Sequence, residues 1–128
     1  MHEEAFDDSF TINARRLDHE VLLVEMVGEL DVRTVAQAKA FLVQVTAMTP
    51  RHLIVDLSGL TFLSSSGMAL LIGAQSGRDG IHGRLRLIGV FGNHPVERPL
   101  GLIGLLEQFE IAPDLATLMA ELDAIEPV

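Results

Sequence analysis

The sequence of 128 residues is long enough for one domain with a single hydrophobic core. Its 18 acidic and nine basic residues give a net charge of −9, which argues against binding to a nucleic-acid backbone. No apolar run reaches the roughly 18 to 20 residues of a membrane-spanning helix, and the acidic start is unlike a signal peptide. Cysteine is absent, which excludes disulfides and zinc–thiolate sites. The composition predicts a cytoplasmic globular domain without a membrane segment.

The first half of the chain predicts two strands, a helix and a third strand. Residues 1–9 are mostly polar and acidic, so we expect a flexible segment there. Two strand-like runs at 10–17 and 21–27 are separated by three polar residues, which is typical of a hairpin. Apolar residues recur at helical spacing over 35–45, and the run at 53–57 is typical of a buried parallel strand.

The second half continues the alternation of helices and strands. We expect a buried helix at 67–75, a strand at 84–90, and a proline-interrupted helix at 94–106. A last short strand at 109–112 precedes an amphipathic helix at 115–125. The order β-β-α-β-α-β-α-β-α predicts one α/β domain over 10–125, with a mixed β-sheet of four to five strands packed with about four helices.

Three consecutive serines precede the apolar helix predicted at 67–75. A serine side chain at the start of a helix accepts a hydrogen bond from a backbone N–H group, so capping is a simpler explanation for Ser64, Ser65 and Ser66 than a regulatory site. By the same reasoning we interpret Asp31 as the cap of the first helix. Glycine is expected at position 28 for a turn and at position 67 for close packing.

Sequence motifs of enzymes and cofactor sites are missing. The serine run lacks the G-x-S-x-G pattern of hydrolases, and no acid and histidine follow it in a recognisable motif. No glycine-rich phosphate loop is present, and the histidines and acidic residues fit no known metal-ligand spacing. We therefore predict a protein that is not an enzyme, with no catalytic residue, no metal and no cofactor.

Residues 54–68, with the sequence IVDLSGLTFLSSSGM, resemble a strand–loop–helix signature of the STAS domain family. That signature reads D-L-S-x-(L/V)-x-F-(I/M/L)-D-S-(S/T)-G-(L/M). The tetrapeptide GELD at 28–31 is similar to a second motif of the family, and VER at 96–98 and GL at 104–105 are similar to landmarks of its third helix. The resemblance covers about residues 10–122. Two positions depart from the pattern, because Ser64 replaces an aspartate and Pro99 stands where a bulky apolar residue is common.

The resemblance implies partner switching by an anti-sigma factor antagonist. Such proteins bind an anti-sigma factor that is also a GHKL-type serine/threonine kinase, and thereby release a sigma factor. The kinase phosphorylates one serine, which ends the complex, and a serine phosphatase removes the phosphate. The register of the motif assigns phosphorylation to Ser65. The implied partner-binding residues are Asp31, Ser64, Ser65, Ser66 and Gly67.

A second function stays open within the same family. A STAS domain that is not phosphorylated acts as a sensor of a nucleotide or another small molecule, or as a regulatory scaffold. Ser64 in place of the family aspartate is the feature that keeps this alternative open. The sequence names neither the kinase nor the sigma factor, and it leaves the oligomeric state undetermined.

Overall fold

A computed structural model describes residues 2–7, 9–77 and 84–125. Its elements are, in chain order, β1 (His2–Asp7), β2 (Phe10–Asp18), β3 (Val21–Leu30), α1 (Val35–Thr46), β4 (His52–Leu63), α2 (Ser65–Ser76), β5 (Arg84–Ile88), α3 (His94–Leu102), the 3-10 helix η1 (Leu106–Gln108) and α4 (Leu115–Ile125). None of the helices in the described part of the chain has the length and apolar character needed to cross a bilayer.

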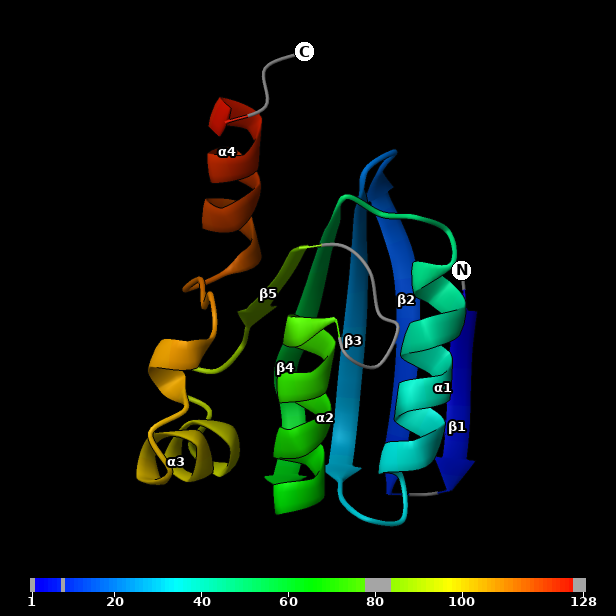
Figure 1. Ribbon diagram of the computed structural model, residues 1–128, viewed down its shortest axis with the longest axis vertical. Helices are drawn as coiled ribbons and strands as arrows, with labels where there is room; N and C mark the ends of the chain where they lie inside the picture. Colours follow the sequence, from blue (N-terminus) through cyan, green and yellow to red (C-terminus); the bar gives the residue numbers. More distant parts are fainter. Residues whose placement is uncertain (1, 8, 78–83, 126–128) are drawn as a thin grey trace.

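The five strands form one mixed sheet in the order β1-β2-β3-β4-β5. The pairs β1–β2 and β2–β3 are antiparallel, whereas β3–β4 and β4–β5 are parallel. Parallel neighbours need a crossover connection, and α1 and α2 provide the helices of the two crossovers. Figure 1 shows these two helices side by side in front of the same face of the sheet. The predicted α/β fold with a mixed sheet is confirmed.

The main core lies between the sheet and the helices α1 and α2. Because side chains of a strand alternate between the two faces, Leu22, Val24 and Met26 of β3 all point to this core. The helix α2 contributes buried residues around much of its circumference, as its apolar sequence predicted. The two helices supply Ala38, Phe41, Leu42, Val45, Met68, Leu70, Leu71 and Ala74 to this core.

A smaller core covers the opposite face of the sheet. Here Leu23, Ile54 and Ile88, one from each of the three parallel strands, pack with Leu118 and Leu122 of α4. The amphipathic stripe of the last helix is therefore confirmed as a packing surface. The two faces of the sheet are covered by different helices, as in a layered α/β domain.

Residues 1–9 and the segment 109–112 differ from the sequence-based expectation. Residues 1–9 were predicted to be flexible, whereas His2–Asp7 form β1 and pair with β2. An edge strand can form through backbone pairing with its neighbour, without the apolar alternation by which a strand is recognised in a sequence. The strand predicted at 109–112 is present as one parallel bridge between Leu87 and Ile111.

The helix predicted at 94–106 is shorter in the structure. It ends at Leu102, and a turn through Gly104, with a φ of 72°, leads to η1. Pro99 lies inside α3 and lacks the N–H group that would continue the backbone ladder. The helix nevertheless continues past Pro99, and it ends because Gly104 adopts the left-handed conformation just after its last turn, where the N–H group of Gly104 donates to the carbonyl oxygen of Gly101 at 3.1 Å.

Candidate functional site

The candidate site begins at the junction of β4 and α2. Ser64 has an extended backbone and is the N-cap of α2, with its Oγ accepting a hydrogen bond from the N–H group of Gly67 at 3.1 Å. The carbonyl oxygen of Ser64 accepts the N–H group of Met68 at 2.9 Å. The sequence-based prediction that Ser64 caps this helix is confirmed, so serine performs the capping that an aspartate at this position would also perform.

Ser65 is the first residue of α2 and is exposed to solvent. Ser66 follows in the first turn and is half-buried. The first N–H groups of a helix have no partner within the helix, so the start of α2 has a positive potential. Of the two serines, Ser65 is the more accessible to a second protein.

Gly67 brings α2 into close contact with β3. A Cβ atom at this position would lie 2.8 Å from Cδ1 of Leu63 and 2.9 Å from the carbonyl oxygen of Leu30. The packing role predicted for this glycine is therefore confirmed. Because Gly67 is buried, any effect on a partner is exerted through the position of α2 rather than through direct contact.

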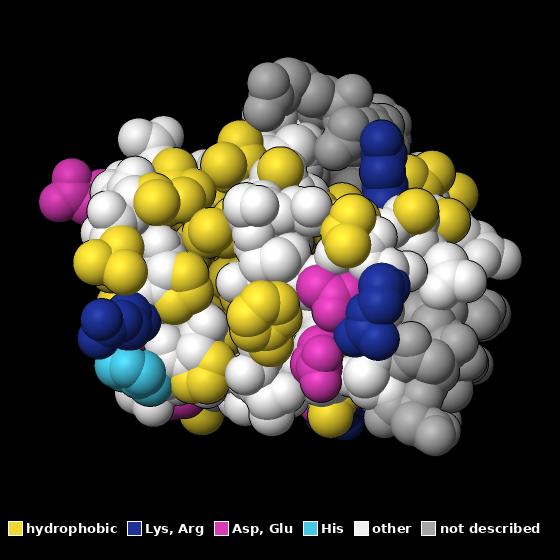
Figure 2. All heavy atoms as spheres, turned by 90° about the horizontal axis from the view of Figure 1, so that it is seen from below, with side chains coloured by type: hydrophobic (Ala, Val, Ile, Leu, Met, Phe, Trp, Pro, Cys, Tyr) yellow, Lys and Arg dark blue, Asp and Glu magenta, His cyan; other side chains and the backbone are white. Residues whose placement is uncertain are grey.

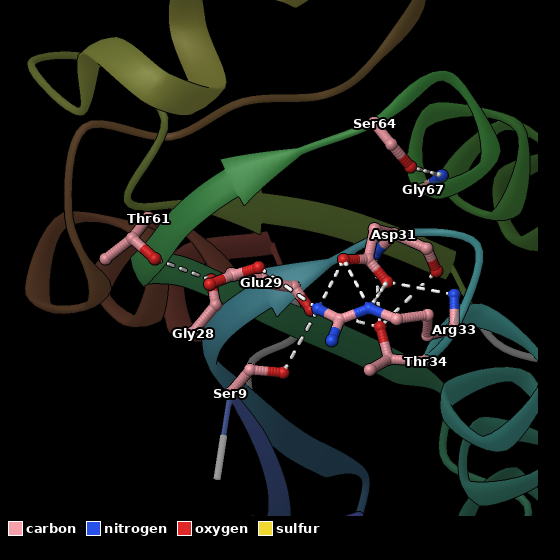
Figure 3. A network of polar contacts seen from close by, with 9 residues as sticks. All are labelled: Ser9, Gly28, Glu29, Asp31, Arg33, Thr34, Thr61, Ser64 and Gly67. Carbon is pink, nitrogen blue, oxygen red and sulfur yellow. Dashed lines mark hydrogen bonds and ion pairs between the residues drawn. The ribbon is translucent and has the colours of Figure 1, made fainter. Parts of the chain in front are cut away.

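The end of β3 lies directly beside the serine run. The N–H group of Ser64 donates to the carbonyl oxygen of Leu30 at 3.0 Å, and Leu30 pairs with Leu63 in the parallel ladder. Figure 3 shows Ser64 and Gly67 next to the turn that contains Asp31. The structure thus brings together four of the predicted site residues, Asp31 and the three serines, although Asp31 lies 33 or more positions before the serines in the sequence.

Asp31 does not cap α1, contrary to the sequence-based interpretation. Helix α1 begins at Val35 with Thr34 as its N-cap, because a turn separates Asp31 from the helix. The carboxylate of Asp31 instead accepts the backbone N–H group of Arg33 at 2.9 Å, which stabilises that turn. The side chain of Asp31 is only 13% exposed.

The side chain of Arg33 contacts both oxygens of the Asp31 carboxylate, and the sequence analysis did not single it out. Its Nη2 atom donates to Oδ2 of Asp31 at 2.8 Å and to Oε1 of Glu29 at 3.1 Å (Figure 3). The side-chain hydrogen bonds from Arg33 hold the pKa of Asp31 below its usual value, with smaller contributions from the backbone N–H group and the charge of Arg33. Two carboxylates are thus bridged by one guanidinium group.

Thr34 is a second residue that the sequence analysis missed. Its buried Oγ1 accepts the N–H group of Asp31 at 3.1 Å and donates to the carbonyl oxygen of Glu29 at 3.0 Å. Threonine three positions after aspartate is a recognisable turn pattern, and it could have been found on that ground. The end of β3 and the turn that follows it, residues 28–34, are called the GELD turn below. Its backbone is therefore held independently of the guanidinium group.

Gly28 has a φ of 103°, and a Cβ atom there would lie 1.9 Å from the carbonyl oxygen of Ser9. The sequence predicted a glycine requirement at a turn. The structure places that requirement within β3, where the strand passes very close to the start of β2.

The serine run lies on an end of the molecule that also exposes hydrophobic side chains. Figure 2 views this end and shows many hydrophobic side chains beside a compact group of acidic and basic ones. Five large hydrophobic residues are exposed in segments at or near this end, namely Val32, Phe62, Phe91, Leu102 and Ile103. In soluble proteins, large contiguous patches of exposed apolar surface mark sites of protein–protein contact. Within the described residues, no group of three or more histidine or acidic side chains is placed to hold a metal ion.

Known proteins resemble this chain in sequence and in fold. The profile of the STAS domain family matches residues 12–118. The anti-sigma-F factor antagonist RsfB of Mycobacterium tuberculosis is 33% identical over 110 residues, which cover 81% of this chain and 82% of RsfB. The crystal structure of an anti-sigma factor antagonist from Mycobacterium paratuberculosis is 28% identical and superposes with a TM-score of 0.75, covering 89% of this chain and 94% of that one.

A Moorella thermoacetica RsbS variant shares the fold, with a TM-score of 0.71 and 21% identity, covering 89% of this chain and 96% of that one. The profile match, the identity to RsfB and the fold all lead to one assignment. This chain belongs to the STAS domain family.

Proposed function

We propose that this chain is an anti-sigma factor antagonist whose partner is an anti-sigma factor with serine kinase activity. The unmodified protein binds that kinase and so releases a sigma factor. Phosphorylation of Ser65 ends the complex, and a serine phosphatase restores the unmodified form. In this proposal the chain itself carries out no catalysis.

The observation that carries the proposal is the exposed position of Ser65 at the first residue of α2. Its neighbour Ser64 performs the capping, so the hydroxyl group of Ser65 is not needed for that purpose. The same end of the molecule carries Asp31 and exposed hydrophobic side chains, among them Phe62 and Leu102. The 33% identity to an anti-sigma-F factor antagonist supports this choice of partner.

The place of Ser65 also fits a modification that leaves the fold intact. A phosphate group adds about −1.5 to −2 charges at neutral pH. The start of a helix favours an anion through its unpaired N–H groups and its dipole. The phosphate is therefore tolerated within this domain, and its cost falls on the interface, where a bulky dianion would have to lose its water.

The experiment uses the purified chain with ATP, magnesium and each GHKL-type anti-sigma factor kinase encoded in the same genome. We expect one kinase to form a complex and to phosphorylate the wild-type protein. The site is located by mass spectrometry, with Ser65→Ala as the test variant and Ser66→Ala as its matched neighbour. The chain contains no Trp and no Tyr, so the complex is followed with a labelled kinase.

The two variants separate the outcomes. Loss of phosphorylation in Ser65→Ala, with normal phosphorylation in Ser66→Ala, supports the assignment. Phosphate on Ser66, with Ser65→Ala still modified, would mean that the acceptor is wrong. A chain that binds none of the kinases contradicts the proposed function as a whole.

The alternative function as a nucleotide sensor finds little support in the pocket between β5 and α4. This pocket has a volume of about 130 Å³ and is lined by Arg86, Glu110, Ile111, Ala112, Leu118 and Glu121. Pockets for small-molecule ligands usually measure about 300 to 1,000 Å³.

A further inference from the structure

The GELD turn concentrates negative charge beside the serine run. Glu29 and Asp31 lie two positions apart, and both carboxylates contact the same Nη2 atom of Arg33, at 3.1 and 2.8 Å. The Nε atom of Arg33 adds contacts of 3.3 and 3.2 Å to the two oxygens of Asp31. One guanidinium group therefore offsets part of the charge of two carboxylates.

The backbone that carries this charged group is adjacent to the backbone of the serine run because of the β3–β4 pairing. The residue before Asp31 accepts the N–H group of Ser64 at 3.0 Å, and Ser65 is the next residue along the chain. Any anion formed on Ser65 therefore experiences the field of the GELD turn. With Arg33 the two carboxylates and one guanidinium group give that turn one net negative charge, and without Arg33 they would give two.

We infer that Arg33 acts in the phosphorylation switch through its charge: it offsets the charge of Glu29 and Asp31, so that a phosphoryl group can be transferred to Ser65. This inference rests on the proposed function. In the transfer, Oγ of Ser65 forms a bond to the γ-phosphorus of ATP held by the kinase. The bond from that phosphorus to the bridging oxygen breaks, ADP leaves, and the hydroxyl proton passes to a base of the kinase.

The role of Arg33 is electrostatic, because other groups hold the turn. Thr34 Oγ1 bonds to the N–H group of Asp31 and to the carbonyl oxygen of Glu29. The backbone N–H group of Arg33 bonds to Asp31 Oδ1 and is retained in every side-chain variant. Replacing the side chain of Arg33 thus changes the charge of the turn more than its shape. The side chain is 55% exposed, so solvent screens its effect and the expected change is modest.

The experiment measures the rate of Ser65 phosphorylation under single-turnover conditions for wild type, Arg33→Gln and Arg33→Lys. We expect the rate to fall about three- to tenfold in Arg33→Gln, since charges at a protein surface interact with energies of roughly this size. The Lys variant should recover most of the rate. Added salt should shrink the difference between Gln and wild type, because it screens the exposed carboxylates. Arg16→Gln, an exposed arginine near the hairpin at the other end of β2, is the charge-matched control.

A second readout does not depend on the kinase. The pKa of Asp31, measured by NMR titration of its carboxyl carbon, should rise in Arg33→Gln and stay unchanged in Arg16→Gln. Equal phosphorylation rates in wild type and Arg33→Gln would overturn the inference. A loss of rate that Arg33→Lys does not recover and that added salt does not reduce would overturn it as well. Either result leaves the proposed function intact. Failure of every kinase to modify the wild-type chain removes the proposed function, and this role of Arg33 with it.

Discussion

The N–H group of Ser64 donates to the carbonyl oxygen of Leu30 at 3.0 Å, and this bond joins two motifs that are more than 30 positions apart in the sequence. It extends the β3–β4 pairing to the first residue beyond β4. Helix α2 therefore starts at a fixed place relative to the GELD turn. The geometry of the candidate site depends on this junction.

Gly67→Ala should destabilise the protein by about 1 to 3 kcal/mol, the usual cost of overpacking. The added methyl group would lie 2.9 Å from the carbonyl oxygen of Leu30, which is backbone and cannot move without shifting β3. Urea unfolding followed by far-UV circular dichroism measures the change. Gly101→Ala is the control, because its new Cβ atom would meet only Cδ1 of Leu106 at 3.4 Å. Equal stability of the two variants would contradict the packing described for Gly67.

Leu118→Asp should unfold or aggregate the protein. Leu118 is 1% exposed and packs in the core between α4 and the sheet. Burying an unpaired carboxylate there costs several kcal/mol, against a total stability of roughly 5 to 15 kcal/mol. Ala120→Asp places the same charge on an exposed position of the same helix and should remain folded. A cooperative unfolding transition of Leu118→Asp at the wild-type midpoint would show that α4 is placed wrongly.

Asn93→Ala should lower the stability by about 1 to 3 kcal/mol. The Nδ2 atom of Asn93 donates to the carbonyl oxygens of Leu57 and Leu60, at 2.8 and 3.1 Å, beyond the part of β4 that pairs with β5. Removing the amide leaves these part-buried acceptors without that donor. The exposed neighbour His94 provides the control variant His94→Ala. Thermal unfolding distinguishes the two, and a wild-type midpoint for Asn93→Ala would contradict a stabilising role of these two hydrogen bonds.

The stability of the protein should fall in acid as Asp31 and Asp114 become protonated. The pKa of Asp31 is lowered by the side chain of Arg33, and the pKa of Asp114 by the backbone N–H group of Thr117. A lowered pKa in the folded state contributes stability above the unfolded value, which is about 3.9 for aspartate, and that contribution is lost as the pH falls through the folded value.

Urea titrations between pH 7 and pH 2.5 measure this dependence. Asp31→Asn should be less stable than wild type at pH 7, and the difference should shrink below about pH 4. A difference that stays constant with pH would show that the charge of Asp31 contributes nothing to stability.

The strands and helices were largely predictable from periodicity and from turn residues. The apolar stripe that contains Leu118 and the cap at Ser64 follow from general rules on helices, and both are found in the structure. Strand β1 was not predictable, because it depends on pairing with β2 and not on the pattern of its own residues.

The candidate site was predictable only in part. The family motif identified the serine run and Asp31, but not the use that the fold makes of Asp31. A turn of three residues displaces the start of α1 to Val35, so the carboxylate binds Arg33 and does not cap the helix. The contact between the GELD turn and α2 arises from strand pairing between distant segments, which a single sequence does not display.

The role of Ser65 as the switch is tested most directly by comparing the unmodified and the Ser65-phosphorylated protein. Affinity for the anti-sigma factor kinase and the melting temperature are measured for both forms. We expect an unchanged or slightly raised melting temperature, because the start of α2 accommodates an anion. We also expect affinity to fall more than a hundredfold, which corresponds to a loss of about 3 kcal/mol at the interface. Equal affinity of the two forms, or a large drop in melting temperature on phosphorylation, would contradict this account.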